Sequence, residues 1–235
     1  MQIFADALRD GIAAFSQGTI DVWGIVWTSL QTSGTAVFFS LFLGIPAGFF
    51  LGTRRFIGRR LLITIANTGM GLPPVAVGLI VAMTLSRRGP LGDLDLLYTR
   101  PAMVIAQVII ALPIVAAVTA AAVGAVPREV RLQARSLGAS RIHEAILTLA
   151  EARLGLVAAV AAGFGQIISE VGAVTMVGGN LEGSTRVMTT AIVQFTRMGK
   201  YGPALALSAV LLGLIFLVNV LLAAGQHSAD RFERT

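Results

Sequence analysis

The chain has 235 residues, of which 55% are hydrophobic and only 13% are charged, and its mean hydropathy is +0.81. Soluble domains carry about 25% charged residues, so this composition excludes an ordinary soluble protein and predicts an integral membrane protein. The absence of cysteine excludes disulfides and thiolate metal sites, and the 18 Lys and Arg residues lie in short clusters rather than on one face, which excludes a nucleic-acid partner.

Residues 1–20 are predicted to form an amphipathic helix that lies in the membrane interface. Phe4, Leu8, Ile12 and Phe15 recur at helical spacing, with charged residues on the other faces. A cap packed on the outer surface of the protein is the alternative. The segment has neither the basic start nor the cleavage site of a signal peptide.

Five apolar stretches follow, and each is predicted to cross the bilayer as a helix. They cover residues 26–51, 61–85, 102–123, 154–177 and 203–224. Pro46 is expected to be tolerated within the first stretch, whereas Pro73 and Pro74 are expected to kink or break the second. The third is expected to be broken once, at Pro113, and residues 178–202 are predicted to be a long polar-to-amphipathic loop.

The arginines predict how these helices are oriented. Residues 53–60 contain four arginines, which is typical of a cytoplasmic loop. Five spans then place residues 124–153 and the C-terminus in the cytoplasm and the N-terminus outside. This orientation also puts more Lys and Arg inside than outside.

Residues 128–153 form a polar segment between the third and fourth spans. Its core, Ala-Arg-Ser-Leu-Gly-Ala-Ser at 134–140, is followed by Leu-Thr-Leu-Ala at 147–150. The pattern resembles the cytoplasmic signature of ABC importer permeases, which runs Glu-Ala-Ala, three residues, Gly, about nine residues, then Ile-x-Leu-Pro. Leu132 stands in place of the Glu, and Ala150 in place of the Pro.

The resemblance implies that 128–153 is a coupling loop of two short helices joined near Gly138, which docks in a groove of an ATPase subunit. The residues it assigns to ATPase coupling are Gln133, Ala134, Arg135, Ser136, Leu137, Gly138, Ala139 and Ser140. An ordinary solvated loop between helices is the alternative.

Three further stretches indicate which kind of ABC importer permease the chain resembles. The sequence LPPVAVG at 72–78 resembles the second span of molybdate and sulfate permeases. Together with 86–92 and 168–192, residues 67–79 resemble the tungstate permeases more closely. The resemblance implies an all-α, type I ABC importer permease fold with one permease domain over 1–235, in the inner (plasma) membrane of a prokaryote. It also implies a homodimer, two ATPase subunits and an extracytoplasmic tungstate-binding protein.

Glu170 lies inside the fourth predicted span, where an unpaired carboxylate costs about 2.5–3.5 kcal/mol on insertion scales. We expect a structural or gating pair between Glu170 and Arg186 rather than contact with a dianion. Arg186 and nearby hydroxyl groups offer the donors that suit a tetrahedral oxyanion. The residues assigned to a translocation path or gate are Pro73, Pro74, Glu170, Arg186, Thr189 and Thr190. A simple kink at the prolines, and ordering of an extracytoplasmic loop by the others, are the alternatives.

The chain shows no phosphate-binding loop, no metal-ligand spacing and no catalytic group of residues. We therefore expect a transport subunit rather than an enzyme, without a cofactor of its own, with ATP and magnesium bound by the partner ATPase. The predicted substrate is tungstate. The alternatives are the same machine for molybdate or sulfate, a secondary transporter or channel, and a membrane-embedded enzyme.

Overall fold

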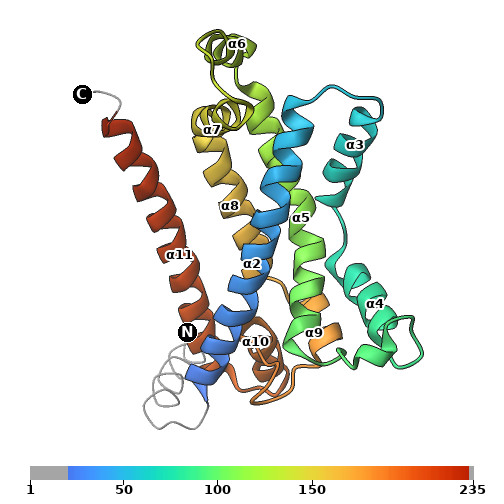
Figure 1. Cartoon of the computed structure of the whole chain (residues 1–235). Helices are drawn as coiled ribbons and strands as arrows, with labels where there is room; N and C mark the ends of the chain where they lie inside the picture. Colours follow the sequence, from blue (N-terminus) through green and yellow to red (C-terminus); the bar gives the residue numbers. More distant parts are fainter. Residues whose placement is uncertain (1–20, 233–235) are drawn as a thin grey trace. The chain divides into compact units, whose positions relative to one another are not determined.

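The computed structural model describes residues 21–232, and the side chains of residues 21–224. Every regular element in this part of the chain is a helix (Figure 1). The predicted interfacial helix over residues 1–20 lies outside the described residues. The helices are α2 (Val22–Thr53), α3 (Arg59–Gly69), α4 (Pro74–Leu85), the short 3-10 helix η1 (Gly92–Leu94), α5 (Arg100–Ala125), α6 (Arg128–Ser136), α7 (Arg141–Glu151), α8 (Arg153–Ile168), α9 (Gly172–Gly178), α10 (Met188–Arg197) and α11 (Tyr201–Phe232).

Within the described residues, three helices are long and apolar enough to cross a membrane: α2, α5 and the 201–224 part of α11. Two further pairs, α3 with α4 and α7 with α8, raise the number to five when each pair is counted as one span. In the second pair α8 carries the apolar part, because α7 begins with charged residues. The predicted all-helical membrane fold is therefore confirmed.

The predicted fourth span differs from the structure, because the chain breaks at residues 169–171 between α8 and α9. With 16 residues, α8 is about 24 Å long, less than the roughly 30 Å of a bilayer core. The break coincides with Glu170, whose carboxylate accepts a hydrogen bond from the N–H of Ala173 (2.9 Å) in the first turn of α9. A carboxylate stabilises the N-terminus of a helix, where backbone N–H groups are free, but not the interior of one.

Two other predictions about the helices need correction. Pro113 does not break α5, which continues through it; a proline removes only one backbone donor, and a membrane helix tolerates that loss. Residues 178–202 are not all loop, since α10 forms within them. Met188, Ala191 and Phe195 of α10 are buried on one face at helical spacing.

The predictions for the other prolines agree with the structure. The helix α2 continues through Pro46, and the chain is broken between Gly69 and Pro74.

The chain divides into two compact units, and α2 and α5 each run from one into the other. Among the described residues, the first unit holds 21–36, 73–107 and 167–221. Its core joins the start of α2 to α10 and α11 through Val22, Ile25, Met188, Ala191, Phe195, Ala204 and Leu207. Here too α4 packs closely on α9: a Cβ on Gly78 would lie 2.6 Å from the Ala173 Cα, so only glycine fits.

The second unit holds residues 37–72, 108–166 and 222–232 of the described chain. Glycines 44, 48 and 52 recur every fourth residue along α2 and bring its backbone against α5; a Cβ on Gly48 would lie 2.5 Å from the Ala116 carbonyl oxygen. Such spacing of small residues is typical of helix pairs in membranes. A buried cluster of Val123, Val126 and Ala152 then anchors the start of α6 and the end of α7 on α5.

Candidate functional site: a projecting helix pair and a buried helix break

The polar segment 128–153 folds as α6 and α7 with a tight connection at 137–140 (Figure 1). Gly138 has φ +83°, a left-handed conformation that glycine adopts without steric cost. The amide of Ala139 donates to the Ala134 carbonyl (3.0 Å) and thereby closes the end of α6. Ser140 caps α7, since its Oγ accepts a hydrogen bond from the N–H of His143 (3.3 Å). The sequence thus encodes a sharp reversal between two short helices.

A two-pronged ion pair joins the two helices. Arg135 of α6 donates from Nε and Nη2 to the two carboxylate oxygens of Glu144 on α7, at 2.7 and 2.9 Å. These hydrogen bonds hold the pKa of the Glu144 carboxyl below its ordinary value. Arg135, one of the residues on which the family resemblance rests, therefore also links α6 to α7.

Several apolar side chains of this otherwise polar segment face solvent. Leu137 at the connection is 87% exposed, Ile142 72% and Ile146 59%. They lie outside the three long apolar helices α2, α5 and α11. Exposed apolar groups rimmed by polar residues mark surfaces that bind another protein or a membrane.

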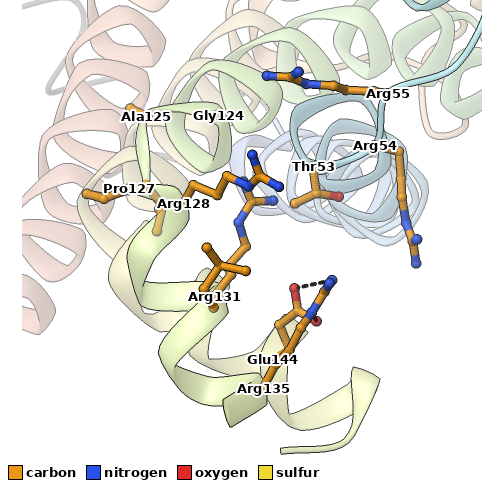
Figure 2. Close-up of a pocket in the computed structure, with 12 residues that line it drawn as sticks. Thr53, Arg54, Arg55, Gly124, Ala125, Pro127, Arg128, Arg131, Arg135 and Glu144 are labelled. Atoms are coloured by element: carbon orange, nitrogen blue, oxygen red, sulfur yellow. Dashed lines mark hydrogen bonds and ion pairs between the residues drawn. The ribbon is translucent and has the colours of Figure 1, made fainter.

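Beside the helix pair lies a cavity of about 600 Å³, here called the arginine pocket (Figure 2). The charged side chains that line it are Arg54, Arg55, Arg128, Arg131, Arg135 and Glu144. Thr53 at the end of α2, residues 124–127 at the end of α5 and in the connection to α6, and Leu132 complete its wall. Among the residues that line the pocket, Glu144 is the one acid, and it is paired with Arg135. The pocket is therefore strongly positive.

The second candidate region is the break at Glu170 in the first unit. Glu170 is 6% exposed, and its carbonyl oxygen accepts a hydrogen bond from the Thr189 hydroxyl (2.8 Å). Both residues line a cavity of about 10 Å³, together with Ser29, Ser33, Gln107 and four apolar residues. A cavity of this volume holds about one water molecule, not an oxyanion. In this arrangement the chain's own groups surround the carboxylate.

The paired prolines meet Glu170 through the starts of two helices. Pro74 is the first residue of α4, and a Cβ on Gly172, the first residue of α9, would lie 2.6 Å from Val75 Cγ2. The helix breaks at Pro73–Pro74 and at Glu170 therefore lie next to each other, although about 100 residues separate them in the sequence. Of the predicted path residues, the structure brings Pro73, Pro74, Glu170 and Thr189 together.

Arg186 does not pair with Glu170 among the described residues, so the predicted Glu170–Arg186 pair was wrong. Its Nη1 is instead 3.2 Å from Glu182 Oε2, one turn away, and its buried Nε has no hydrogen-bond partner within the described part of the chain. Local sequence proximity explains the choice, because Glu182 and Arg186 share one loop. Thr190 also has a local role: its hydroxyl accepts from the N–H of Val187 (3.1 Å) at the start of α10.

Arg186 lines a cavity of about 170 Å³ together with Arg100, a residue that the sequence analysis does not single out. Arg100 begins α5 and donates to the Ser184 carbonyl (2.8 Å) and to Gln31 Oε1 (2.8 Å). Asp21 and Glu182 line the same cavity, so its charges nearly balance. The sequence signal for Arg100 is weak: a charged residue directly before a long apolar helix is usual at a membrane interface.

These features define a class: a helical membrane protein of several spans, with a charged helix pair between spans and two adjoining helix breaks. Residues 44–227 match the family described as binding-protein-dependent transport system inner membrane component. The chain belongs to that family of transport permeases, and the resemblance predicted from the coupling signature is confirmed.

Known relatives agree with this assignment. The chain is 43% identical to a probable anion ABC transporter permease protein of Haloferax volcanii over 88% of this chain and 90% of that protein. It is 37% identical to the tungstate uptake system permease protein TupB of Peptoclostridium acidaminophilum over 97% of this chain and 100% of that protein. The molybdenum transport system permease protein ModB of Escherichia coli is 28% identical over 83% of this chain and 90% of its own.

Among solved structures, the fold resembles a chain of the inward-facing MetNI methionine ABC transporter. The TM-score is 0.65 at 21% identity, over 88% of this chain and 92% of that one. The likeness confirms the predicted type of permease fold.

Proposed function

We propose that this chain is the membrane-spanning subunit of an ATP-driven importer that moves tungstate from an extracytoplasmic binding protein into the cytoplasm. The observation that carries the proposal is the near full-length similarity to a tungstate permease, at 37% identity. The functional unit would be a homodimer with two ATPase subunits, which bind the ATP and magnesium.

The helix pair α6–α7 is proposed to dock on the ATPase. Three observations support this role: the signature residues 134–140 lie at the reversal, Leu137 stands exposed there, and the Arg135–Glu144 pair links the two helices. Movement of an ATPase groove would then pass through Gln133–Ser140 to α5 and α8, which directly flank the helix pair in the chain. This docking requires the segment 128–153 to face the cytoplasm, with the N-terminus outside and the C-terminus inside.

The adjoining breaks at Pro73–Pro74 and Glu170 are proposed to serve as the gate of the translocation path. Broken helices at membrane depth line cavities or are buried against other parts of the protein. Thr189 joins this gate through its hydrogen bond to Glu170. Arg186 is proposed to attract the oxyanion at a separate position, because its Nε is buried without a partner among the described groups.

A transport assay tests both the substrate and the coupling. The chain is reconstituted in liposomes with its ATPase and binding protein, and uptake of tungstate, molybdate and sulfate is measured with and without ATP. We expect ATP-dependent uptake with tungstate preferred. Preference for molybdate or sulfate would keep the machine and change its substrate, whereas equal uptake without ATP would favour a secondary transporter.

Two matched pairs of variants test the docking surface. Leu137→Asp introduces charge at the 87%-exposed reversal, and Ile57→Asp does the same at a fully exposed residue of the α2–α3 loop. Likewise, Gly138→Asp and Gly58→Asp both alter an open glycine with positive φ. The helix-pair variants are expected to lose ATPase binding and uptake, while the loop variants keep both. Equal losses in each pair would contradict docking through α6–α7.

A further inference from the structure

We propose that the arginine pocket binds an oxyanion of the phosphate class, supplied either as a free tetrahedral ion or as the phosphate of an anionic phospholipid. The inference does not depend on the transported substrate. It concerns the residues at the ends of α2 and α5 and at the start of α6, and its first support is charge. Five arginines and one glutamate line the pocket, so the walls carry a large positive excess.

The one carboxylate in the pocket, that of Glu144, is already ion-paired. Both oxygens of Glu144 accept hydrogen bonds from Arg135. Arg54, Arg55, Arg128 and Arg131 have no ion pair among the side chains of residues 21–224, and the buried Nε of Arg131 has no hydrogen-bond partner there. A buried donor without an acceptor costs free energy, and an anion in the pocket would remove that cost. Guanidinium forks match the geometry of phosphate oxygens.

The wall of the pocket adds backbone donors. Residues 125–128 line it, and α6 begins there at Arg128 after Pro127, whose side chain gives no capping hydrogen bond. The first amides of α6 thus need acceptors, and an anion held by the arginines supplies them. This contribution is secondary to that of the arginines.

The size and position of the pocket fit both sources of the anion. Its volume of about 600 Å³ lies within the usual 300–1,000 Å³ of small-molecule sites, so a lipid headgroup has room. The pocket also adjoins Thr53 and Ala125, the last residues of two long apolar helices, where lipid headgroups are expected. Basic pockets at such positions recognise the phosphates of anionic lipids.

The test uses the purified full-length chain, stripped of lipid, in an uncharged detergent. One arm titrates inorganic phosphate calorimetrically, and the other adds phosphatidylglycerol or phosphatidylcholine and counts retained lipids by native mass spectrometry. Arg128→Gln combined with Arg131→Gln removes two pocket charges and spares the proposed coupling residues. Arg87→Gln combined with Arg88→Gln is the matched control, because this arginine pair lies in the 86–92 loop and Arg87 is 93% exposed.

The pocket variant is expected to bind its anion at least about tenfold more weakly, equivalent to ~1.4 kcal/mol, whereas the control binds as the unmodified chain does. Phosphate binding identifies a free ion, and selective retention of phosphatidylglycerol identifies a lipid. No binding by the unmodified chain in either arm, or equal weakening in both variants, would overturn the proposal.

A second measurement needs no variant and guards against misfolding. Phenylglyoxal modifies accessible arginines, and mass spectrometry locates the modified sites. Saturating anion is expected to protect Arg128 and Arg131 while Arg87 stays reactive. Unchanged modification of Arg128 and Arg131 in the presence of the anion would refute the site even if a variant behaved as expected.

Discussion

The helix pair α6–α7 and the break at Glu170 both contain charged side chains, but these are mostly exposed at the helix pair and buried at the break. At the helix pair, arginines outnumber acids around an open pocket, and apolar side chains such as Leu137 face solvent. At the break, one carboxylate is 6% exposed and bonded to the N–H of Ala173. The helix pair exposes charged and apolar groups that other molecules can contact, whereas the polar groups at the break form hydrogen bonds within the chain.

This difference predicts where substitutions will mainly change partner binding and where they will mainly change stability. Helices of 9 and 11 residues, such as α6 and α7, are marginal by themselves. They depend on a cap, an ion pair and a small buried cluster, so modest changes there should alter partner binding more than global stability. The break is packed backbone against backbone, so changes there should lower the stability of the whole first unit.

The strongest test of this contrast is Gly78→Ala. The new Cβ would lie 2.6 Å from the Ala173 Cα, which forces α4 and α9 apart, and overpacking of this kind costs about 1–3 kcal/mol. A lower Tm is expected for the detergent-solubilised chain. Gly213→Ala in α11 is the control, because no atom lies within 4 Å of its added Cβ; better helix propensity should leave Tm unchanged or raise it. Equal effects would show that α4 and α9 are not tightly packed.

Removal of the Glu170 carboxylate should have the next largest effect. Glu170→Ala leaves the Ala173 amide without its acceptor, and the loss of such a cap costs about 0.5–2 kcal/mol. Glu170→Gln keeps an acceptor oxygen and should lose less. At pH 7 we expect the Tm to be highest for the unmodified chain, lower for Glu170→Gln and lowest for Glu170→Ala. A Gln variant as unstable as the Ala variant would mean that the charge itself, rather than the hydrogen bond, stabilises the break.

These two regions are easier to locate in the sequence than to describe from it. Composition and apolar runs were sufficient for most of the membrane spans, and the reversal near Gly138 was predicted from the resemblance of residues 134–140 to the coupling signature. The division of residues 154–177 into α8 and α9 was not, since an apolar run looks the same whether its helix is continuous or broken. Only the position of a carboxylate within that run pointed to the break.

Other features depended on contacts between distant residues. The neighbourhood of Val75 and Gly172, and the place of Arg100 beside Arg186, come from packing that one sequence does not record. Arg186 paired with Glu182 because a neighbour in the same loop is reached at little entropic cost. The helix α10 was detectable in principle, because Met188, Ala191 and Phe195 already have helical spacing, but hydroxyl-rich surroundings masked it.

At the helix pair, Ser140→Ala should have a smaller effect than either change at the break. It removes the hydroxyl that caps α7, which is typically worth ~1 kcal/mol, but the loss is local to two short helices. Amide hydrogen exchange in residues 141–144 should rise while the global Tm changes little. Ser136→Ala is the control: its exposed hydroxyl bonds only to the Gln133 carbonyl of its own helix (2.8 Å). A large fall in global Tm for Ser140→Ala would contradict the local role.

The smallest effect on Tm is expected from the loss of the Arg135–Glu144 pair, and it can be detected by its dependence on pH. Hydrogen bonds from Arg135 lower the pKa of the Glu144 carboxyl from its ordinary 4.5. The folded form therefore gains stability from the ion pair above pH 4.5 and loses it as the pH falls through the lowered pKa; raising the pH further changes nothing. The Tm difference between the unmodified chain and Glu144→Gln should be small at pH 7 and should close in acid. A difference that instead widened as the pH fell would show that the carboxylate is strained in the folded chain, and that Arg135 serves the arginine pocket rather than the joint between α6 and α7.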